Sequence, residues 1–252
     1  MADDGMLPRI MRVLSCFSDD EPAVGAGELA ARSGIPISTV HRLVTDLVDQ
    51  GLLARAPGRT YTIGPRLWEL GELSPLSLRL RETALPHMAR LYEATGENVH
   101  LAVLDGPSPA ASVALFVGRV TGTGAIPTLS RMGGRQPLHT TGVGKALLST
   151  RDEAWLERYF AVPLQRETTH SIVDEERLRA ELRRAARRGY ATTREEMTLG
   201  NVSVAAPVAL VQGLPPIAIG VVVHLDRADE RRLAPIVVQA ARDLHRDLRV
   251  SR

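Results

Sequence analysis

The chain has 252 residues, of which 44% are hydrophobic and 24% charged, and its formal net charge at pH 7 is +2. These proportions are typical of a globular protein of one large or two ordinary domains. Because the chain has one cysteine, no basic and apolar leader and no apolar run of membrane-spanning length, we expect a cytoplasmic protein without internal disulfides or membrane contact.

The first fifty residues predict a helix-turn-helix. A helix over residues 7–17 is followed by an acidic loop and by a short helix over 27–33. Residues 34–36, Gly-Ile-Pro, form a turn, because glycine permits positive φ and proline cannot continue the preceding helix. The next helix, residues 37–50, has apolar residues at the i, i+3, i+4, i+7 spacing of one buried face. They are Val40, Leu43, Val44 and Leu47.

The opposite face of that helix carries hydroxyls, an imidazole and a guanidinium, the groups that read base edges or hold phosphates in a major groove. Strands predicted over 52–55 and 60–63 pair around residues 56–59 and form a wing. Some side chains are predicted to face bases, and others to contact the DNA backbone or the minor groove. The first set is Ser38, Arg42 and Thr45, and the second is Thr39, His41, Arg55 and Arg59. The alternative is an ordinary surface helical hairpin, since short helix-turn-helix patterns also arise by chance.

Charge is distributed unevenly in this region. Residues 1–75 carry seven arginines and ten acids, a net charge of −3, whereas a DNA-binding domain is usually basic. Much of the acid lies before the predicted reading helix, and residues 32–66 carry five arginines against Asp46 and Asp49. The local charge therefore favours DNA binding, although the total does not.

A further helix begins at Gly64-Pro65 and is interrupted at Ser74-Pro75. Its apolar residues have no evident partner in so small a module, so they form either a dimer contact or a packing surface for the downstream domain. They are Leu67, Trp68, Leu70 and Leu73. We divide the chain into a winged helix-turn-helix domain over 1–63, a linker helix over 64–77 and a second domain over 78–252.

The second domain mixes helices and strands. After a helix closed by Gly96, strands are predicted over 98–104, 113–120, 128–132, 190–193, 202–208 and 217–223. Helices are predicted within 140–149 and over 153–160, 174–188 and 230–248. This order contains few strand-helix-strand repeats, so it favours an α+β fold over a doubly wound one.

Motifs for catalysis, cofactors or metals are missing. Residues 139–147, HTTGVGKAL, lack the first glycine and the final Ser or Thr of a phosphate-binding loop. No histidine pair has metal-ligand spacing, so we predict no catalysis, cofactor or metal site. The backbone N–H groups of Gly142–Gly144 can instead attract a carboxylate at a helix start, or they can form a plain tight turn. Lys145 is the single lysine beside 30 arginines, which calls for a local explanation.

Several short motifs are specific through their order and spacing. They are Ser38-Thr39-Val40-His41-Arg42-Leu43, Asn98-Val99-His100-Leu101-Ala102-Val103, Gly133-Gly134-Arg135, Pro137-Leu138-His139, Gly144-Lys145-Ala146-Leu147-Leu148, Glu195-Glu196, and Gly200 leading to Ala205-Ala206-Pro207-Val208. With them the chain resembles the IclR family of bacterial transcription regulators along nearly its whole length. The resemblance implies a C-terminal effector-binding and oligomerisation domain of GAF/profilin-like architecture. It also implies dimers or dimers of dimers on pseudo-palindromic operators.

The resemblance implies an effector site as well. It uses the loop that matches Gly142 and Val143, together with four side chains that match Thr193, Ser203, Gly220 and Val222. Where the glyoxylate-type members have Asp, Cys and two Ser, this chain lacks the acid and two hydroxyls, so the pocket should be larger and less polar. We expect an effector with a carboxylate at the Gly142–Gly144 turn and an apolar or aromatic body toward Val222.

These observations predict a sequence-specific DNA-binding transcriptional regulator that is controlled by a small organic acid. Repression is favoured over activation. Effector binding would change how two DNA-binding domains are spaced. Two alternatives stay open: a constitutive DNA-binding protein with a vestigial pocket, and an enzyme domain fused to a DNA-binding module.

Overall fold

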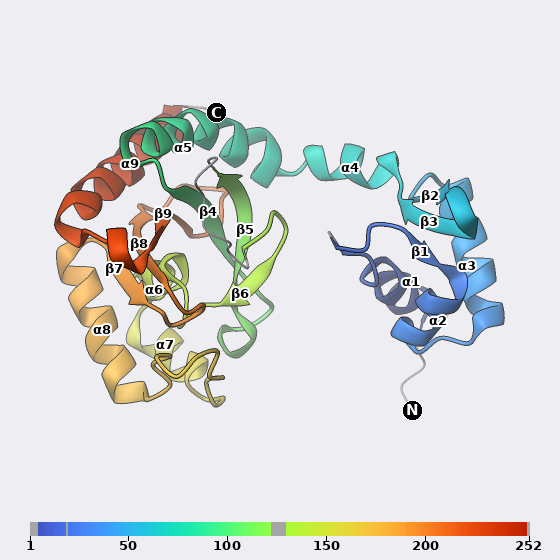
Figure 1. Ribbon diagram of the computed structural model, residues 1–252, viewed down its shortest axis with the longest axis horizontal. Coiled ribbons are helices and arrows are strands. Elements are labelled where there is room, and N and C mark those ends of the chain that lie inside the picture. The colour runs from blue at the N-terminus through green and yellow to red at the C-terminus, as the bar shows by residue number, and fades with distance from the viewer. Residues whose placement is uncertain (1–4, 19, 122–129, 251–252) are drawn as a thin grey trace. The chain divides into compact units, whose positions relative to one another are not determined.

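The computed structural model describes residues 5–18, 20–121 and 130–250, and the chain divides into two compact units, Met1–Ser74 and Pro75–Arg252 (Figure 1). The first unit is built around one hydrophobic core, and the second has a core on each face of a central sheet. Within the described ranges, no helix is both long enough and apolar enough to cross a bilayer.

The first unit is a winged helix-turn-helix. Its helices are α1 (Met6–Leu14), α2 (Ala26–Ser33), α3 (Ile37–Asp49) and α4 (Pro65–Glu72), and its hairpin strands are β2 (Leu53–Ala56) and β3 (Thr60–Ile63). Gly34 ends α2 with a φ of 66°, which explains the glycine in the turn before α3. The four apolar residues that define the inner face of α3 are all buried, which confirms the predicted orientation of this helix.

Two details of the first unit differ from the prediction. A two-residue strand, β1 (Val24–Gly25), pairs antiparallel with β3 and completes a sheet of order β1-β3-β2. The helix predicted over 7–17 ends at Leu14, and Cys16 and Phe17 then reach the same core from a turn. Their apolar character continues the helical pattern in the sequence although the backbone has already turned.

The second unit is organised around a six-stranded antiparallel sheet of order β6-β5-β4-β9-β8-β7. The strands are β4 (Asn98–Asp105), β5 (Val113–Val120), β6 (Arg135–Pro137), β7 (Ala191–Arg194), β8 (Asn201–Val208) and β9 (Ile217–His224). Because side chains alternate across a strand, each strand contributes residues to both faces of the sheet.

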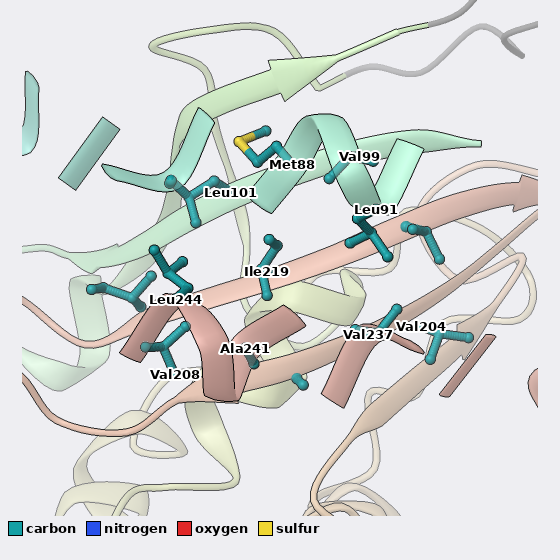
Figure 2. Close-up of a cluster of buried hydrophobic side chains, with 14 of the residues drawn as sticks. Met88, Leu91, Val99, Leu101, Val204, Val208, Ile219, Val237, Ala241 and Leu244 are labelled. Atoms are coloured by element: carbon teal, nitrogen blue, oxygen red, sulfur yellow. The ribbon is translucent and has the colours of Figure 1, made fainter. Parts of the chain in front are cut away.

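One face of this sheet is covered by α5 (Glu82–Thr95) and α9 (Glu230–Val250) (Figure 1). A π-helical turn, Leu76–Arg81, leads into α5. Figure 2 shows Met88 and Leu91 of α5 and Val237 and Leu244 of α9 packed against side chains of the strands, among them Ile219. This apolar layer covers one face of the sheet, and the polar groups described below lie on the opposite face.

The opposite face carries α6 (Gly142–Leu148), α7 (Glu153–Tyr159) and α8 (Glu175–Arg188) around a second core. The caps predicted for α8 are present: the Asp174 side chain accepts a hydrogen bond from Arg177 N–H, and Gly189 follows the helix with a φ of 79°. Helices on both faces of an antiparallel sheet confirm the predicted α+β class.

The prediction of a strand over 128–132 is wrong for the three residues of that range that the structure describes. Residues 128 and 129 lie outside the described residues, and Ser130–Met132 form no strand. The edge strand is instead β6, which pairs with β5 through Val113 and Pro137. Gly133, with a φ of 72°, lies between the two segments and forms the turn that leads into β6. The sequence Arg-Gln-Pro has no apolar alternation, so pattern alone does not reveal this strand.

Candidate functional site

The outward face of α3 presents the side chains that were predicted to read DNA. Ser38, His41, Arg42 and Thr45 are exposed, and Thr39 is half-buried. The Thr45 hydroxyl donates its proton to the His41 carbonyl at 2.9 Å, so its oxygen can accept a hydrogen bond from a binding partner. The structure therefore brings these five residues together on one surface.

The wing adds two arginines, Arg55 on β2 and Arg59 at the hairpin tip, and both are exposed. The Arg55 guanidinium lies 5.8 Å from the centroid of the Tyr61 ring. Arg59 has a φ of 60°, a left-handed conformation that is uncommon for a residue with a side chain. In the described part of the chain no carboxylate pairs with Arg42, Arg55 or Arg59, so their charges are available to phosphates.

A cavity in the second unit lies between the sheet and the start of α6, and we call it the central cavity. Its empty space is about 530 Å³ with the open mouth included. All six residues that were matched to an effector site line it, namely Gly142, Val143, Thr193, Ser203, Gly220 and Val222. The structure thus brings together residues that are up to 80 positions apart in the sequence.

The floor of the central cavity is formed by registered residues of adjacent strands. His100 of β4 is opposite Gly220 of β9, and Gly220 is opposite Ala205 of β8. A Cβ atom on Gly220 would lie 2.5 Å from the Ala205 Cβ, a distance that atoms do not reach without a shift. A glycine here therefore keeps the floor free of a side chain.

The start of α6 forms another wall. Gly142 N–H donates to Ser203 Oγ at 3.1 Å, and Gly144 N–H donates to the Thr141 hydroxyl at 3.2 Å. The Thr193 and Ser203 hydroxyls also bond to one another. Among the described residues, Val143 N–H has no hydrogen-bond partner, whereas the other two N–H groups of the predicted carboxylate turn are paired within the protein.

Sequence reasoning did not assign several residues that line the central cavity. His100, Phe116, Glu196 and Met197 are the most informative. His100 meets the Phe116 ring edge-on, with centroids 5.4 Å apart. Burial, with a smaller contribution from the positive charge of Arg119, lowers the pKa of His100 to about 4. The imidazole is therefore neutral at physiological pH.

The single lysine forms a buried ion pair beside the cavity. Lys145 Nζ donates to Glu196 Oε1 at 2.6 Å, and Lys145 is only 1% exposed. Burial lowers the pKa of Lys145 and raises that of Glu196, and the opposite charge of the partner counteracts both effects. A buried ion pair between α6 and the loop after β7 is thus the local explanation for this lysine.

Nothing in the described ranges resembles a catalytic or metal centre. His139 is buried, where its Nε2–H donates to the Gln165 carbonyl at 2.8 Å and its Nδ1 accepts from the Tyr159 hydroxyl at 3.3 Å. Burial lowers the pKa of His139, as expected for a structural histidine. No group of three His, Cys, Asp or Glu side chains in the described part of the chain could hold a metal ion.

A helix-turn-helix unit with exposed arginines, joined in one chain to a unit with a partly polar cavity, is the arrangement of a DNA-binding regulator of transcription with an effector domain. The family model described as the bacterial transcriptional regulator IclR C-terminal domain matches residues 75–248, and the IclR helix-turn-helix domain matches residues 7–57. The chain therefore belongs to the IclR family. Its members are transcriptional regulators and not enzymes, which removes the alternative of a fused enzyme domain.

Individual relatives support this assignment. The crystal structure of an IclR homologue from Microbacterium hydrocarbonoxydans, complexed with 4-hydroxybenzoate, is 34% identical and has a TM-score of 0.89, with 98% of this chain and 100% of that chain covered. The HTH-type transcriptional regulator BhcR of Paracoccus denitrificans is 31% identical over 96% of this chain and 88% of its own. The transcriptional repressor IclR of Escherichia coli is 28% identical over 94% of this chain and 88% of its own.

Proposed function

We propose that the chain is a cytoplasmic repressor that binds a specific operator through α3 and the wing and responds to a small organic acid in the central cavity. The observation that carries the proposal is the convergence of all six matched effector residues on one cavity. That relatives of similar length are named repressors supports the direction of regulation.

In the DNA complex, Ser38, Arg42 and Thr45 would face base edges in the major groove. Thr39 and His41 at the flanks of α3, and Arg55 and Arg59 on the wing, would contact phosphates or the minor groove. Six of these side chains are exposed, and the three arginines have no acidic partner in the part of the chain that the structure describes, which supports these roles.

The effector would be an organic acid with an aromatic or apolar body. Its carboxylate would accept a hydrogen bond from Val143 N–H at the start of α6. Its body would lie against Phe116, Met197 and Val222, where the cavity is apolar. The 4-hydroxybenzoate in the Microbacterium homologue supports an aromatic acid. Compared with the glyoxylate-type members, this chain has no acid at Thr193 and no hydroxyl at Gly220 or Val222, which also favours an effector with an aromatic or apolar body.

The active species would be a homodimer or a dimer of dimers on a pseudo-palindromic operator. The helix α4 and its C-cap residue Leu73 expose apolar side chains in the single chain, with Trp68 68%, Leu70 47% and Leu73 69% exposed. Apolar side chains gathered on one exposed helix favour a contact with a second copy. Effector binding would then alter the spacing of the two DNA-binding units in the dimer.

The experiment that tests the proposal is selection of bound sites from a random duplex library at near-physiological salt. The wild-type chain should enrich one pseudo-palindrome, and Arg42→Ala should abolish the enrichment while thermal unfolding stays unchanged. Arg66→Ala removes an exposed arginine of α4 that pairs with Glu69, and it serves as the matched control. Salt-sensitive binding without any enriched sequence would contradict sequence-specific recognition.

The effector part has its own test. Addition of benzoate or of its hydroxylated forms should raise the melting temperature of the protein and release the selected duplex. Absence of a thermal shift across a broad panel of organic acids would favour the constitutive alternative with a vestigial pocket. Micromolar binding of glyoxylate or pyruvate would contradict the larger, less polar pocket.

A further inference from the structure

Two buried polar atoms on the wall of the central cavity have no hydrogen-bond partner among the described residues. They are Nε2 of His100 and Oε2 of Glu196. His100 is 2% exposed and Glu196 6% exposed, so bulk water does not satisfy either atom. Because an unpaired buried polar atom costs free energy, both are explained if a ligand supplies the missing partners.

Glu196 is held firmly, with one carboxylate oxygen left over. Its Oε1 accepts from Lys145 Nζ, and its backbone carbonyl accepts from the Ser171 hydroxyl at 2.7 Å. The preceding residue, Glu195, has a φ of 58° and accepts from Gly200 N–H through its side chain at 2.8 Å, which fixes the loop. Glu196 lines the cavity and Lys145 does not, and Oε2, the carboxylate oxygen without a partner, requires a hydrogen-bond donor.

His100 presents the complementary chemistry from another wall. It belongs to β4, which β9 and β8 separate from β7 and its following loop in the sheet. Its ring packs edge-on against Phe116, and its position in β4 is opposite Gly220, which has no side chain. Burial keeps this imidazole neutral, so it carries one N–H that can be donated from Nε2 to an acceptor.

We propose that the effector is a hydroxy-substituted aromatic acid whose hydroxyl donates a hydrogen bond to Glu196 Oε2. Its carboxylate, besides the bond from Val143 N–H, accepts one from His100 Nε2–H. This inference rests on the proposed function, in which an organic acid fills the central cavity. The orientation follows from charge, because the Glu196 carboxylate repels the effector carboxylate and attracts a hydroxyl proton. Glu196 and His100 are then the residues that select the effector at its two polar ends.

The first test uses the wild-type chain and needs no variant. Isothermal titration would compare benzoate, the three monohydroxybenzoates and their methoxy counterparts, which have no hydroxyl proton. The best hydroxy isomer should bind at least about tenfold more tightly than its methoxy counterpart and than benzoate, because those two leave Oε2 unpaired. Equal binding of the hydroxy and methoxy compounds would overturn the assignment and leave the aromatic-acid class standing. Absence of binding by every compound would overturn both.

The second test assigns the two residues. Glu196→Gln keeps an oxygen for Lys145 and turns an amide donor toward the cavity, so the preference for hydroxy over methoxy should fall to about threefold or less. Glu195→Gln is the matched control, because that side chain does not line the cavity, and it should keep the wild-type preference. A full hydroxy preference in Glu196→Gln would overturn the role of Glu196.

His100→Phe distinguishes the other end of the effector. It keeps an aromatic ring against Phe116 and removes Nε2–H, so all the benzoates should bind about tenfold more weakly and the hydroxy preference should stay unchanged. Binding as tight as in the wild type would overturn the role of His100. A thermal melt of each variant shows whether it is folded, and if Glu196→Gln fails to fold, the wild-type series decides.

Discussion

The buried His100 should make the second unit sensitive to acid. The pKa of His100 is lowered to about 4, first by burial and second by Arg119, whereas an unfolded histidine titrates near 6.5. As the pH falls below about 6.5, the unfolded chain takes up the proton first, so the free energy of unfolding falls. The loss is progressive down to about pH 4 and reaches about 3 kcal/mol.

Urea unfolding at several pH values measures this effect. Trp155 of α7 reports on the second unit when Trp68 is replaced by Phe. His100→Phe should make the dependence on pH between 6.5 and 4 clearly less steep, and the contribution of His139, whose pKa burial also lowers, should remain. Phe116→Leu, which removes the aromatic neighbour but no titrating group, should lower stability by a similar amount at every pH. A His100→Phe profile as steep as that of the wild type would contradict the assignment.

At the scale of the element, the ion pair between Lys145 and Glu196 holds α6 against the loop after β7. Removal of one partner leaves an uncompensated buried charge, so Lys145→Met should lower the free energy of unfolding by about 3–5 kcal/mol. The double variant Lys145→Met with Glu196→Leu removes both charges and should be considerably more stable than the single variant. Denaturant unfolding gives both values, and a double variant as unstable as the single one would show that packing, not charge, decides.

The elements differ in how well sequence alone could predict them. The helices α3 and α8 have a full apolar face, and α8 also has a capping aspartate and a terminal glycine, so local chemistry predicts them. The strands β1 and β6 have two and three residues, too few for a period, and they exist because a neighbouring strand offers hydrogen-bonding groups. Such strands follow from tertiary structure and have no signal of their own.

The same distinction applies to the candidate site. The family motifs correctly predicted that Gly142, Ser203 and Gly220 belong to one site. Such a prediction is possible because the register of paired strands fixes which residues lie side by side. The contribution of Glu196 and His100 could not be predicted, since it depends on which polar atoms stay unpaired after the chain has packed. The lone Lys145 was visible in the composition, but its reason, a buried carboxylate 51 residues away, required the structure.

At the scale of the whole molecule, the exposed apolar face of α4 should determine assembly on DNA. The double variant Trp68→Glu with Leu73→Glu should weaken operator binding at least about tenfold, because two half-sites are then no longer bound by one coupled dimer. Light scattering should show whether the mass also falls. Val162→Glu, which places one such charge on an exposed apolar residue of the second unit, should bind the operator normally. Unchanged operator affinity in the double variant would contradict a dimer contact through α4.

The two units of each chain should be linked by a reciprocal free energy. If the effector weakens operator binding by some factor, thermodynamic linkage requires the operator to weaken effector binding by the same factor, and such couplings are about 1–3 kcal/mol, or about 5–150-fold. Titration of the effector with and without saturating operator, and of the operator with and without saturating effector, gives the two factors independently. Arg42→Ala should leave the effector affinity of the free protein unchanged and abolish the change caused by operator DNA. An operator affinity that falls while the effector affinity stays constant would mean that the acid does not act through the central cavity.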